Sequence, residues 1–198
     1  LKTQYPGLVT GVGISHEAKI EGEFKLGIHL DYTTGLPVIY GSTVKGVLRS
    51  AFQEKDLLET LPVLVPKVQK ELENIKTKMR GKTLSEWANI IFGDDNDRDN
   101  RSAYSRDTFF DALIDSTNKQ GCILASDSIT PHGNDPLKDP TPLTFLRIAS
   151  GCPIKFRFRL VDSDTLTAKE KAILFKTILI AFGIGAKTNV GYGRLKEQ

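Results

Sequence analysis

A glycine-rich stretch near the C-terminus constrains the fold of this chain more than any other feature. The segment AFGIGAKTNVGYGR has glycines at 183, 185, 191 and 193, directly after an apolar run with helical spacing. Glycine destabilises ordinary helices and strands by roughly 0.5–1 kcal/mol per site relative to alanine. Four glycines so close together indicate a backbone that turns sharply or approaches another group closely. A tight turn and a phosphate-binding loop are the two structures that fit.

The elements around this stretch exclude two familiar glycine motifs. The dinucleotide fingerprint and the P-loop both follow a strand and open a helix, whereas this segment follows a helix. GIGAKT also has Ala186 where a P-loop has the glycine before its lysine. A nucleoside triphosphate is therefore not the expected ligand. We expect a loop of exposed backbone N–H groups, with Lys187, Thr188, Asn189 and Arg194 placed to contact a sugar-phosphate backbone.

Helices are indicated in several regions of the chain. Two of them begin at capping boxes, TLSE (83–86) and TAKE (167–170). The helix that begins at TAKE ends at Gly183. Pro66 suits the first turn of another helix. We therefore interpret residues 54–106 as a mostly helical insertion.

A further helix is expected in GSTVKGVLRSAF, where Ser42 or Thr43 is positioned to cap its N-terminus. Lys45 and Arg49 are four residues apart and share its polar face. Glycines on either side of Lys45 leave room for a strand to pass closely. Lys45 is thus the best single candidate for a phosphate contact, with Ser42 and Arg49 beside it.

Strands are predicted at 23–32, 108–115, 143–149 and 153–161. The last of these alternates four apolar residues with Lys155, Arg157 and Arg159, which places a row of cations on one face. A solvated surface and a track for phosphates explain this row equally well. The order of elements predicts an α+β, ferredoxin-like (RRM-like) βαββαβ fold, in one domain spanning 1–198.

Composition adds weaker constraints. The 198 residues carry a net charge of only +3, but from residue 143 onward ten Lys and Arg face four Asp and Glu, a local net charge of +6. Such a basic portion is typical of a nucleic-acid-binding face. Cys122 and Cys152 form no CxxC motif and are expected to be thiols rather than a disulfide. With no run of eighteen apolar residues, we expect a cytoplasmic protein that contacts no membrane.

Several motifs of the sequence together resemble those of the RAMP superfamily of CRISPR proteins. The glycine-rich loop 183–194 after the second helix matches its most characteristic motif, and GLPVIYGSTVKGVLRSAF, IIFG and FFDA match others. Within that superfamily, YPGLVTGVGISHEA and ITPHGNDPLKDPTPLTFLRIASGCPI resemble the sixth-subunit family of type III-B, or Cmr, effector complexes. The resemblance covers nearly the whole chain, except for the insertion.

This resemblance implies a RAMP fold with a thumb-like excursion over 116–143. It implies a non-catalytic subunit, without metal or cofactor, that holds the 3′ part of a CRISPR guide RNA and its target RNA in antiviral defence. The expected partners are those two RNAs, the backbone RAMP subunit, and the small and other end-capping subunits of the complex. The remaining candidate RNA-binding residues are His132, Lys138, Arg147, Arg157 and Tyr192, although Tyr192 also suits a core position.

Two other functions stay open at this point. A metal-independent endoribonuclease that processes the CRISPR transcript needs a histidine as general acid or base. His132, near Asp127 and Asp135, is the best candidate, but Pro131 and Gly133 indicate a turn instead. The third function is a structural spacer that contacts only protein, for which the apolar LPVLVP segment is suited.

Overall fold

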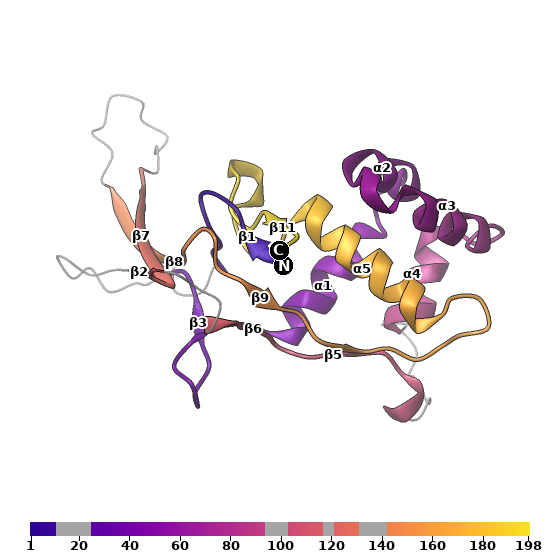
Figure 1. Cartoon of the computed structure of the whole chain (residues 1–198), viewed down its shortest axis with the longest axis horizontal. Coiled ribbons are helices and arrows are strands. Elements are labelled where there is room, and N and C mark those ends of the chain that lie inside the picture. The colour runs from indigo at the N-terminus through magenta and orange to yellow at the C-terminus, as the bar shows by residue number, and fades with distance from the viewer. Residues whose placement is uncertain (11–24, 94–102, 117–120, 131–141) are drawn as a thin grey trace. The chain divides into compact units, whose positions relative to one another are not determined.

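The computed structural model describes residues 1–10, 25–93, 103–116, 121–130 and 142–198 (Figure 1). These residues form two compact units. The first, here called the sheet unit, comprises the described parts of Leu1–Ile39, Leu113–Lys155 and Ile184–Gln198. The second, the helical unit, comprises those of Tyr40–Ala112 and Phe156–Gly183. The predicted α+β class and the predicted order of strands and helices around the glycine-rich loop are confirmed.

Three small sheets build the sheet unit. One pairs β1 (Lys2–Thr3) with β11 (Leu195–Lys196) in antiparallel fashion. The second has the order β3-β4-β6-β9, formed by His29–Leu30, Pro37–Ile39, Ala112–Ile114 and Ile154–Lys155. The third has the order β2-β8-β7, formed by Lys25–Leu26, Leu143–Ile148 and Leu124–Ile129.

The strand predicted over 23–32 is divided between two of these sheets. Gly27 stands at the division, because its N–H donates to the carbonyl oxygen of Leu146 at 3.2 Å and a Cβ there would overlap that same oxygen. Ile28 is buried as expected, but Leu30 is 47% exposed. Placing Leu30 on the buried face was wrong, since the chain leaves β3 there and turns back toward β4 at Asp31.

A hairpin stem occupies part of the predicted excursion. Strand β7 pairs antiparallel with β8 along six residues, from Leu124 opposite Ile148 to Ile129 opposite Leu143. The sequence predicts β8 but not β7, because the segment LASDSI of β7 is too polar to stand out. Residues 131–141, and with them His132 and Lys138, lie outside the described part of the chain.

The helical unit contains five α-helices among its described residues. These are α1 (Gly41–Ala51), α2 (Leu57–Leu64), α3 (Gln69–Lys78), α4 (Leu84–Phe92) and α5 (Ala168–Phe182). Short 3₁₀ turns η1 (Pro66–Val68) and η2 (Ala103–Ser105) and a two-stranded antiparallel ribbon, β5 (Thr108–Phe109) with β10 (Phe158–Arg159), complete it. The helical nature of the insertion, the position of Pro66 and the end of the last helix at Gly183 are confirmed.

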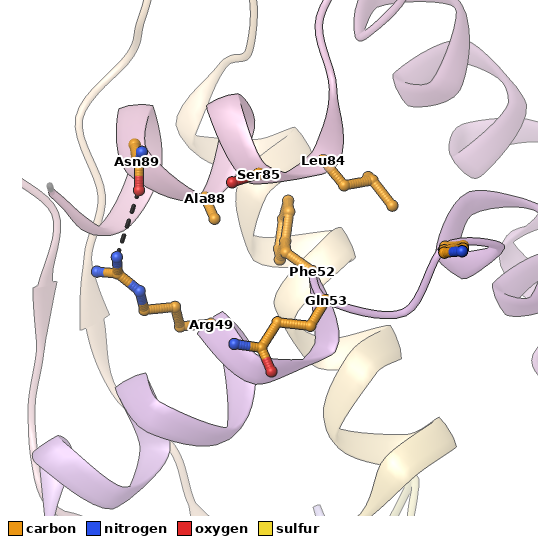
Figure 2. A pocket seen from close by; sticks show the side chains of 8 residues that line it. Arg49, Phe52, Gln53, Leu84, Ser85, Ala88 and Asn89 are labelled. Carbon is orange, nitrogen blue, oxygen red and sulfur yellow. Dashed lines mark hydrogen bonds between the residues drawn. The ribbon is translucent and has the colours of Figure 1, made fainter. Parts of the chain in front are cut away.

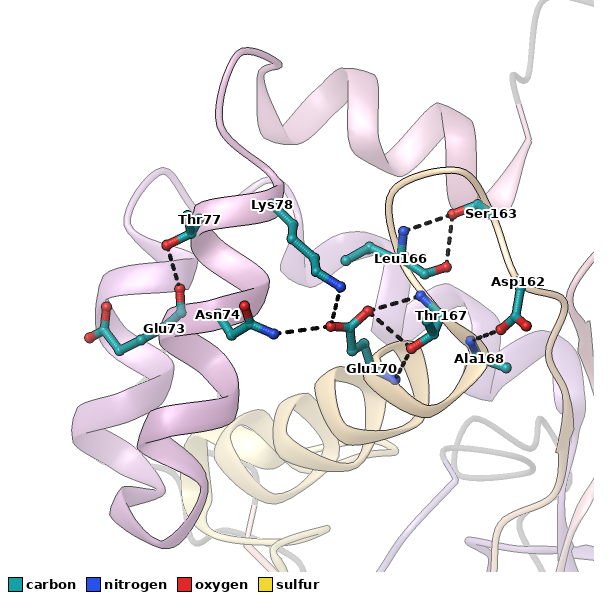
Figure 3. Close-up of polar contacts among 10 residues, drawn as sticks. All are labelled: Glu73, Asn74, Thr77, Lys78, Asp162, Ser163, Leu166, Thr167, Ala168 and Glu170. Atoms are coloured by element: carbon teal, nitrogen blue, oxygen red, sulfur yellow. Dashed lines mark hydrogen bonds and ion pairs between the residues drawn. The ribbon is translucent and has the colours of Figure 1, made fainter.

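Both predicted capping boxes are present, at Thr83 with Glu86 and at Thr167 with Glu170. Glu170 has a second role, because its Oε1 accepts from Lys78 Nζ at 2.6 Å and from Asn74 Nδ2 at 3.2 Å (Figure 3). One carboxylate thereby fixes the start of α5 and joins it to α3 of the insertion.

The cap of α1 differs from the prediction. Tyr40 holds the N-cap position without a side-chain hydrogen bond, and the N–H of Gly41 donates to Asp111 Oδ1 at 2.7 Å. A Cβ at Gly41 would overlap the carbonyl oxygen of Phe109. The helix therefore starts at Gly41, and the carboxylate of Asp111 has the capping role that the sequence predicts for Ser42 or Thr43.

Aromatic rings form much of the core of the helical unit. Phe109 and Phe175 contact each other, and each also contacts Phe92 and Phe158, with ring centroids 5.6–5.8 Å apart. A buried ion pair lies in the same unit: Lys171 Nζ contacts Asp107 Oδ2 at 2.9 Å and donates to the carbonyl of Val161 at 2.8 Å.

Candidate nucleic-acid interface

The glycine-rich loop of the sheet unit closes on itself and on the N-terminal segment. The N–H of Ile184 donates to the carbonyl of Gly193 at 3.0 Å, and the N–H of Gly193 donates to the carbonyl of Gly7 at 2.7 Å. Gly193 has φ +75°, and a Cβ there would overlap the carbonyl oxygen of Ile184. Glycine is required at this position by both the backbone angle and the close approach.

Most of the loop's backbone N–H groups donate hydrogen bonds to carbonyl groups of the same chain. Ala186 donates to the carbonyl of Val9 at 2.6 Å, and Val190 and Tyr192 both donate to the carbonyl of Lys187. Gly191 donates to the carbonyl of Thr188 at 3.1 Å. These particular N–H groups are therefore not available to a phosphate, because their hydrogen bonds close a tight turn. The polar side chains of the loop are the groups considered next.

The polar side chains of this loop are exposed or half-buried. Thr188, Asn189 and Arg194 are exposed, and Lys187 is half-buried with a left-handed φ of 60°. Within the described ranges, no carboxylate lies at ion-pair distance from Lys187 or Arg194. Two cations without a bound acid on one loop are suited to a phosphodiester backbone.

Tyr5 is the exposed aromatic residue of this site, and sequence analysis did not select it. Its side chain is 82% exposed. Its neighbour Gln4 donates from its N–H to the carbonyl of Arg194 and from its side chain to the carbonyl of Leu195, both at 2.9 Å. Tyr5 therefore lies beside Arg194, where its ring is available to stack on a base. The signal in the sequence was a tyrosine held between Gln4 and the Pro-Gly pair of YPG.

Tyr192 is a core residue, the second of its two predicted roles. Only 7% of it is exposed, and its ring packs edge-on against Phe145 with centroids 6.0 Å apart. Its hydroxyl donates to Asp127 Oδ2 at 2.6 Å, and Arg147 Nε donates to the same oxygen at 3.0 Å. Tyr192 and Arg147 thus hold β7 and β8 to the glycine-rich loop, so neither directs its polar group outward.

These contacts perturb the ionisation of both acidic groups. Burial, assisted by the hydrogen bond to Asp127, raises the pKa of Tyr192 to about 12. The pKa of Asp127 is lowered overall. Burial by itself would raise it, but the hydrogen bonds from the Tyr192 hydroxyl and the Ser128 N–H and the charge of Arg147 outweigh that effect. The carboxylate therefore stays ionised and the phenol neutral at physiological pH.

The candidate residues of α1 have different surroundings. Ser42 is exposed and Lys45 is half-buried. The guanidinium of Arg49 donates to the carbonyl of Gly93 at 2.8 Å and to Asn89 Oδ1 at 3.3 Å, so it closes the C-terminal end of α4. Arg49 thus has a structural role beside any contact with RNA.

An open hollow of about 400 Å³ lies between α1 and α4 (Figure 2). Arg49, Phe52, Gln53, Lys55, Leu84, Ser85, Ala88 and Asn89 line it. None of these lining residues carries a carboxylate, imidazole or thiol. Lys55 is the one residue among these eight whose side chain commonly serves as a general acid or base.

The predicted row of cations is divided in two. Its alternation with apolar residues is confirmed, but Lys155 belongs to β9 and Arg159 to β10, in different sheets. Lys155 pairs with Asp115 at 2.9 Å. Arg157 is exposed, and Arg159 lies with its guanidinium carbon 5.8 Å from the ring centre of Tyr104.

A family model settles the class of protein. The model of the RAMP superfamily matches residues 1–196, and the chain therefore belongs to the RAMP superfamily.

Two solved structures are similar to this chain. A chain in the cryo-EM structure of the type III-B Cmr-β complex bound to cognate target RNA has 25% identity and a TM-score of 0.63. The match covers 98% of the present chain and 55% of that chain, so the present chain spans about half its length. Crystalline Cmr6 from Pyrococcus furiosus has 24% identity and a TM-score of 0.49 over 83% of the present chain and 84% of its own. Among curated proteins, none matches.

Membrane-spanning helices and metal-holding clusters were not found in the described part of the chain. Among the described residues, no helix has the length and apolar character needed to cross a bilayer. Over the same ranges, no three His, Cys, Asp or Glu side chains gather in a way that suits a metal ion. Cys122 is exposed and Cys152 is buried, and they form no disulfide, as predicted.

Proposed function

We propose that this chain is a non-catalytic RNA-binding subunit of a type III-B CRISPR ribonucleoprotein in the cytoplasm. In this proposal it occupies the place of the sixth subunit, packs on the backbone RAMP subunit, and holds the 3′ part of the guide RNA with its target RNA. Small and other end-capping subunits complete its set of partners.

The observation that carries the proposal is the glycine-rich loop of a RAMP protein with two exposed or half-exposed cations that no described carboxylate neutralises. Lys187 and Arg194 supply charge, Thr188 and Asn189 supply hydrogen-bonding groups, and Tyr5 supplies an exposed ring. This combination of charge and stacking is what single-stranded nucleic acid requires. The RNA in the Cmr-β structure named above gives the class of ligand by analogy.

A binding assay tests this proposal. The wild-type chain and the variants Lys187→Ala, Arg194→Ala and Tyr5→Ala are titrated into a labelled single-stranded RNA at low salt. We expect each variant to weaken binding about tenfold, which is the effect of losing one charge-assisted or stacking contact of about 1.4 kcal/mol. Arg80→Ala, which removes an exposed cation after α3, is the matched control and leaves the affinity unchanged.

The same samples test the absence of catalysis. The RNA is recovered from each reaction, in buffer with and without magnesium, and its length is compared on a denaturing gel. Intact RNA supports a binding subunit. Cleavage that disappears in His132→Ala would instead establish the endoribonuclease, and failure of the wild type to bind any RNA would favour a spacer that contacts only protein.

A further inference from the structure

The ribbon of β5 and β10 in the helical unit carries aromatic and cationic side chains; its strand β5 is labelled in Figure 1. Phe109 pairs with Phe158 in the antiparallel register, and both rings face the aromatic core. The ladder continues one step further, where the N–H of Phe110 donates to the carbonyl of Arg157 at 3.1 Å. Because side chains alternate along each strand, Phe110, Arg157 and Arg159 belong to the opposite, outward face.

Aromatic and cationic side chains of this outward face are exposed to solvent. Phe110 is 45% exposed and Tyr104, in the turn before β5, is 83% exposed. Arg157 and Arg159 are both exposed, and the guanidinium of Arg159 lies over the ring of Tyr104. Both rings remain largely exposed, and burying them would gain free energy. An exposed apolar surface of this kind is typical of a binding site.

The charge of the ribbon identifies the kind of partner. The two acidic residues nearest in sequence are already engaged, since Asp107 pairs with the buried Lys171 and Asp111 accepts from the first N–H of α1. Among the described residues, no carboxylate lies at ion-pair distance from Arg157. The ribbon therefore presents stacking rings beside positive charge, which complements a single-stranded nucleic acid and not a basic or purely apolar partner.

We propose that the β5–β10 ribbon is a second binding surface for single-stranded RNA, separate from the glycine-rich loop. Tyr104 and Phe110 stack on bases, while Arg157 and Arg159 contact the phosphates between them. This inference rests on the proposed function, because it assumes that the chain binds RNA. It assigns to the helical unit a direct contact with that RNA.

Photo-cross-linking tests the inference on the full chain. The probe is an oligouridylate of about ten nucleotides that carries 5-iodouridine, which cross-links to aromatic rings stacked on it, and the cross-linked peptides are mapped by mass spectrometry. We expect peptides that contain Tyr104 or Phe110. Tyr5→Ala leaves these cross-links in place, because it removes a ring from the other site.

Variants measure the contribution of each group. Tyr104→Ala and Phe110→Ala each weaken RNA binding on the order of tenfold, and Tyr104→Phe retains the affinity because it keeps the ring. Arg157→Gln makes the dependence of log affinity on log salt shallower by about 0.7, the contribution of one phosphate contact to a single strand. Tyr32→Ala, at a fully exposed tyrosine beside Asp31, is the control and changes neither quantity.

Three results would overturn the inference. If Tyr5 and Lys187 variants weaken binding while Tyr104 and Phe110 variants do not, and cross-links map elsewhere, the ribbon binds no RNA although the proposed function stands. If the ribbon variants keep full RNA affinity but lose co-purification with a protein subunit, the surface docks protein. If the wild type binds no RNA, the proposed function fails together with the inference.

Discussion

Replacing Tyr192 with phenylalanine removes one oxygen atom from the network that joins the glycine-rich loop to the β7–β8 hairpin. The ring keeps its contact with Phe145, so packing is preserved. What is lost is the 2.6 Å hydrogen bond from the hydroxyl to Asp127 Oδ2, which leaves Arg147 as the remaining side-chain donor to that oxygen.

The magnitude follows from the partners. A hydrogen bond to a charged group contributes about 1.5–3 kcal/mol, but the Asp127 side chain is 31% exposed, so water replaces part of the loss. We expect Tyr192→Phe to lower the free energy of unfolding by about 1–2 kcal/mol at pH 7. Denaturant titration followed by circular dichroism measures it. Tyr32→Phe, at a fully exposed tyrosine, is the control and leaves stability unchanged.

The same network predicts a pH dependence. The pKa of Asp127 is lowered from its ordinary value of 3.8, so its ionised form contributes stability above that pH and loses this contribution as the pH falls through the lower folded value. Tyr192 supplies part of that stabilisation. The difference in unfolding free energy between wild type and Tyr192→Phe should therefore be smaller at pH 2.5 than at pH 7. A difference below about 0.5 kcal/mol at pH 7, or one that is equal at both pH values, would refute this reasoning.

Three further changes have defined outcomes. Lys171→Met leaves the buried carboxylate of Asp107 without its partner and should cost about 3–5 kcal/mol of unfolding free energy; a loss under about 1 kcal/mol would show that the pair is not buried in solution. Gly193→Ala should unfold the loop and abolish RNA binding, whereas Gly46→Ala, in α1 with open space around it, should stabilise by about 0.5–1 kcal/mol; equal stabilities in thermal melts would contradict the packing described. Arg49→Ala should lower the melting temperature clearly and change the RNA affinity little, because the Arg49 guanidinium closes the end of α4. An unchanged melting temperature together with weaker RNA binding would instead identify Arg49 as a phosphate contact.

Features encoded by neighbouring residues were predictable from the sequence. The two capping boxes depend on a threonine and a glutamate three residues apart, and both formed. The end of α5 at Gly183 and the helical insertion follow from similar local signals. These local signals act within a few residues and do not depend on distant contacts.

Features decided by distant contacts were not predictable. Strands of two residues carry no periodicity, and the division of the first strand at Gly27 depends on the carbonyl of Leu146. Strand β7 is polar and acquires its place by pairing with β8. The cap of α1 comes from Asp111, seventy residues away.

The residues of the candidate site were likewise predictable only where neighbouring residues mark them. Lys187, Thr188, Asn189 and Arg194 were selected because the glycines around them are unmistakable. Tyr5 was missed because only the fold brings the two ends of the chain together, through the pairing of β1 with β11 and the contact of Gln4 with the loop.

The measurement that tests the central claim most directly is the salt dependence of RNA binding. The affinity of the wild type and of the double variant Lys187→Ala/Arg194→Ala for a single-stranded RNA is measured across a series of salt concentrations. Each phosphate contact contributes about −0.7 to the slope of log affinity against log salt. The account predicts a clearly negative slope for the wild type that is shallower by about 1.4 in the double variant. Equal slopes would contradict it, because the loop would then make no contact with the phosphates.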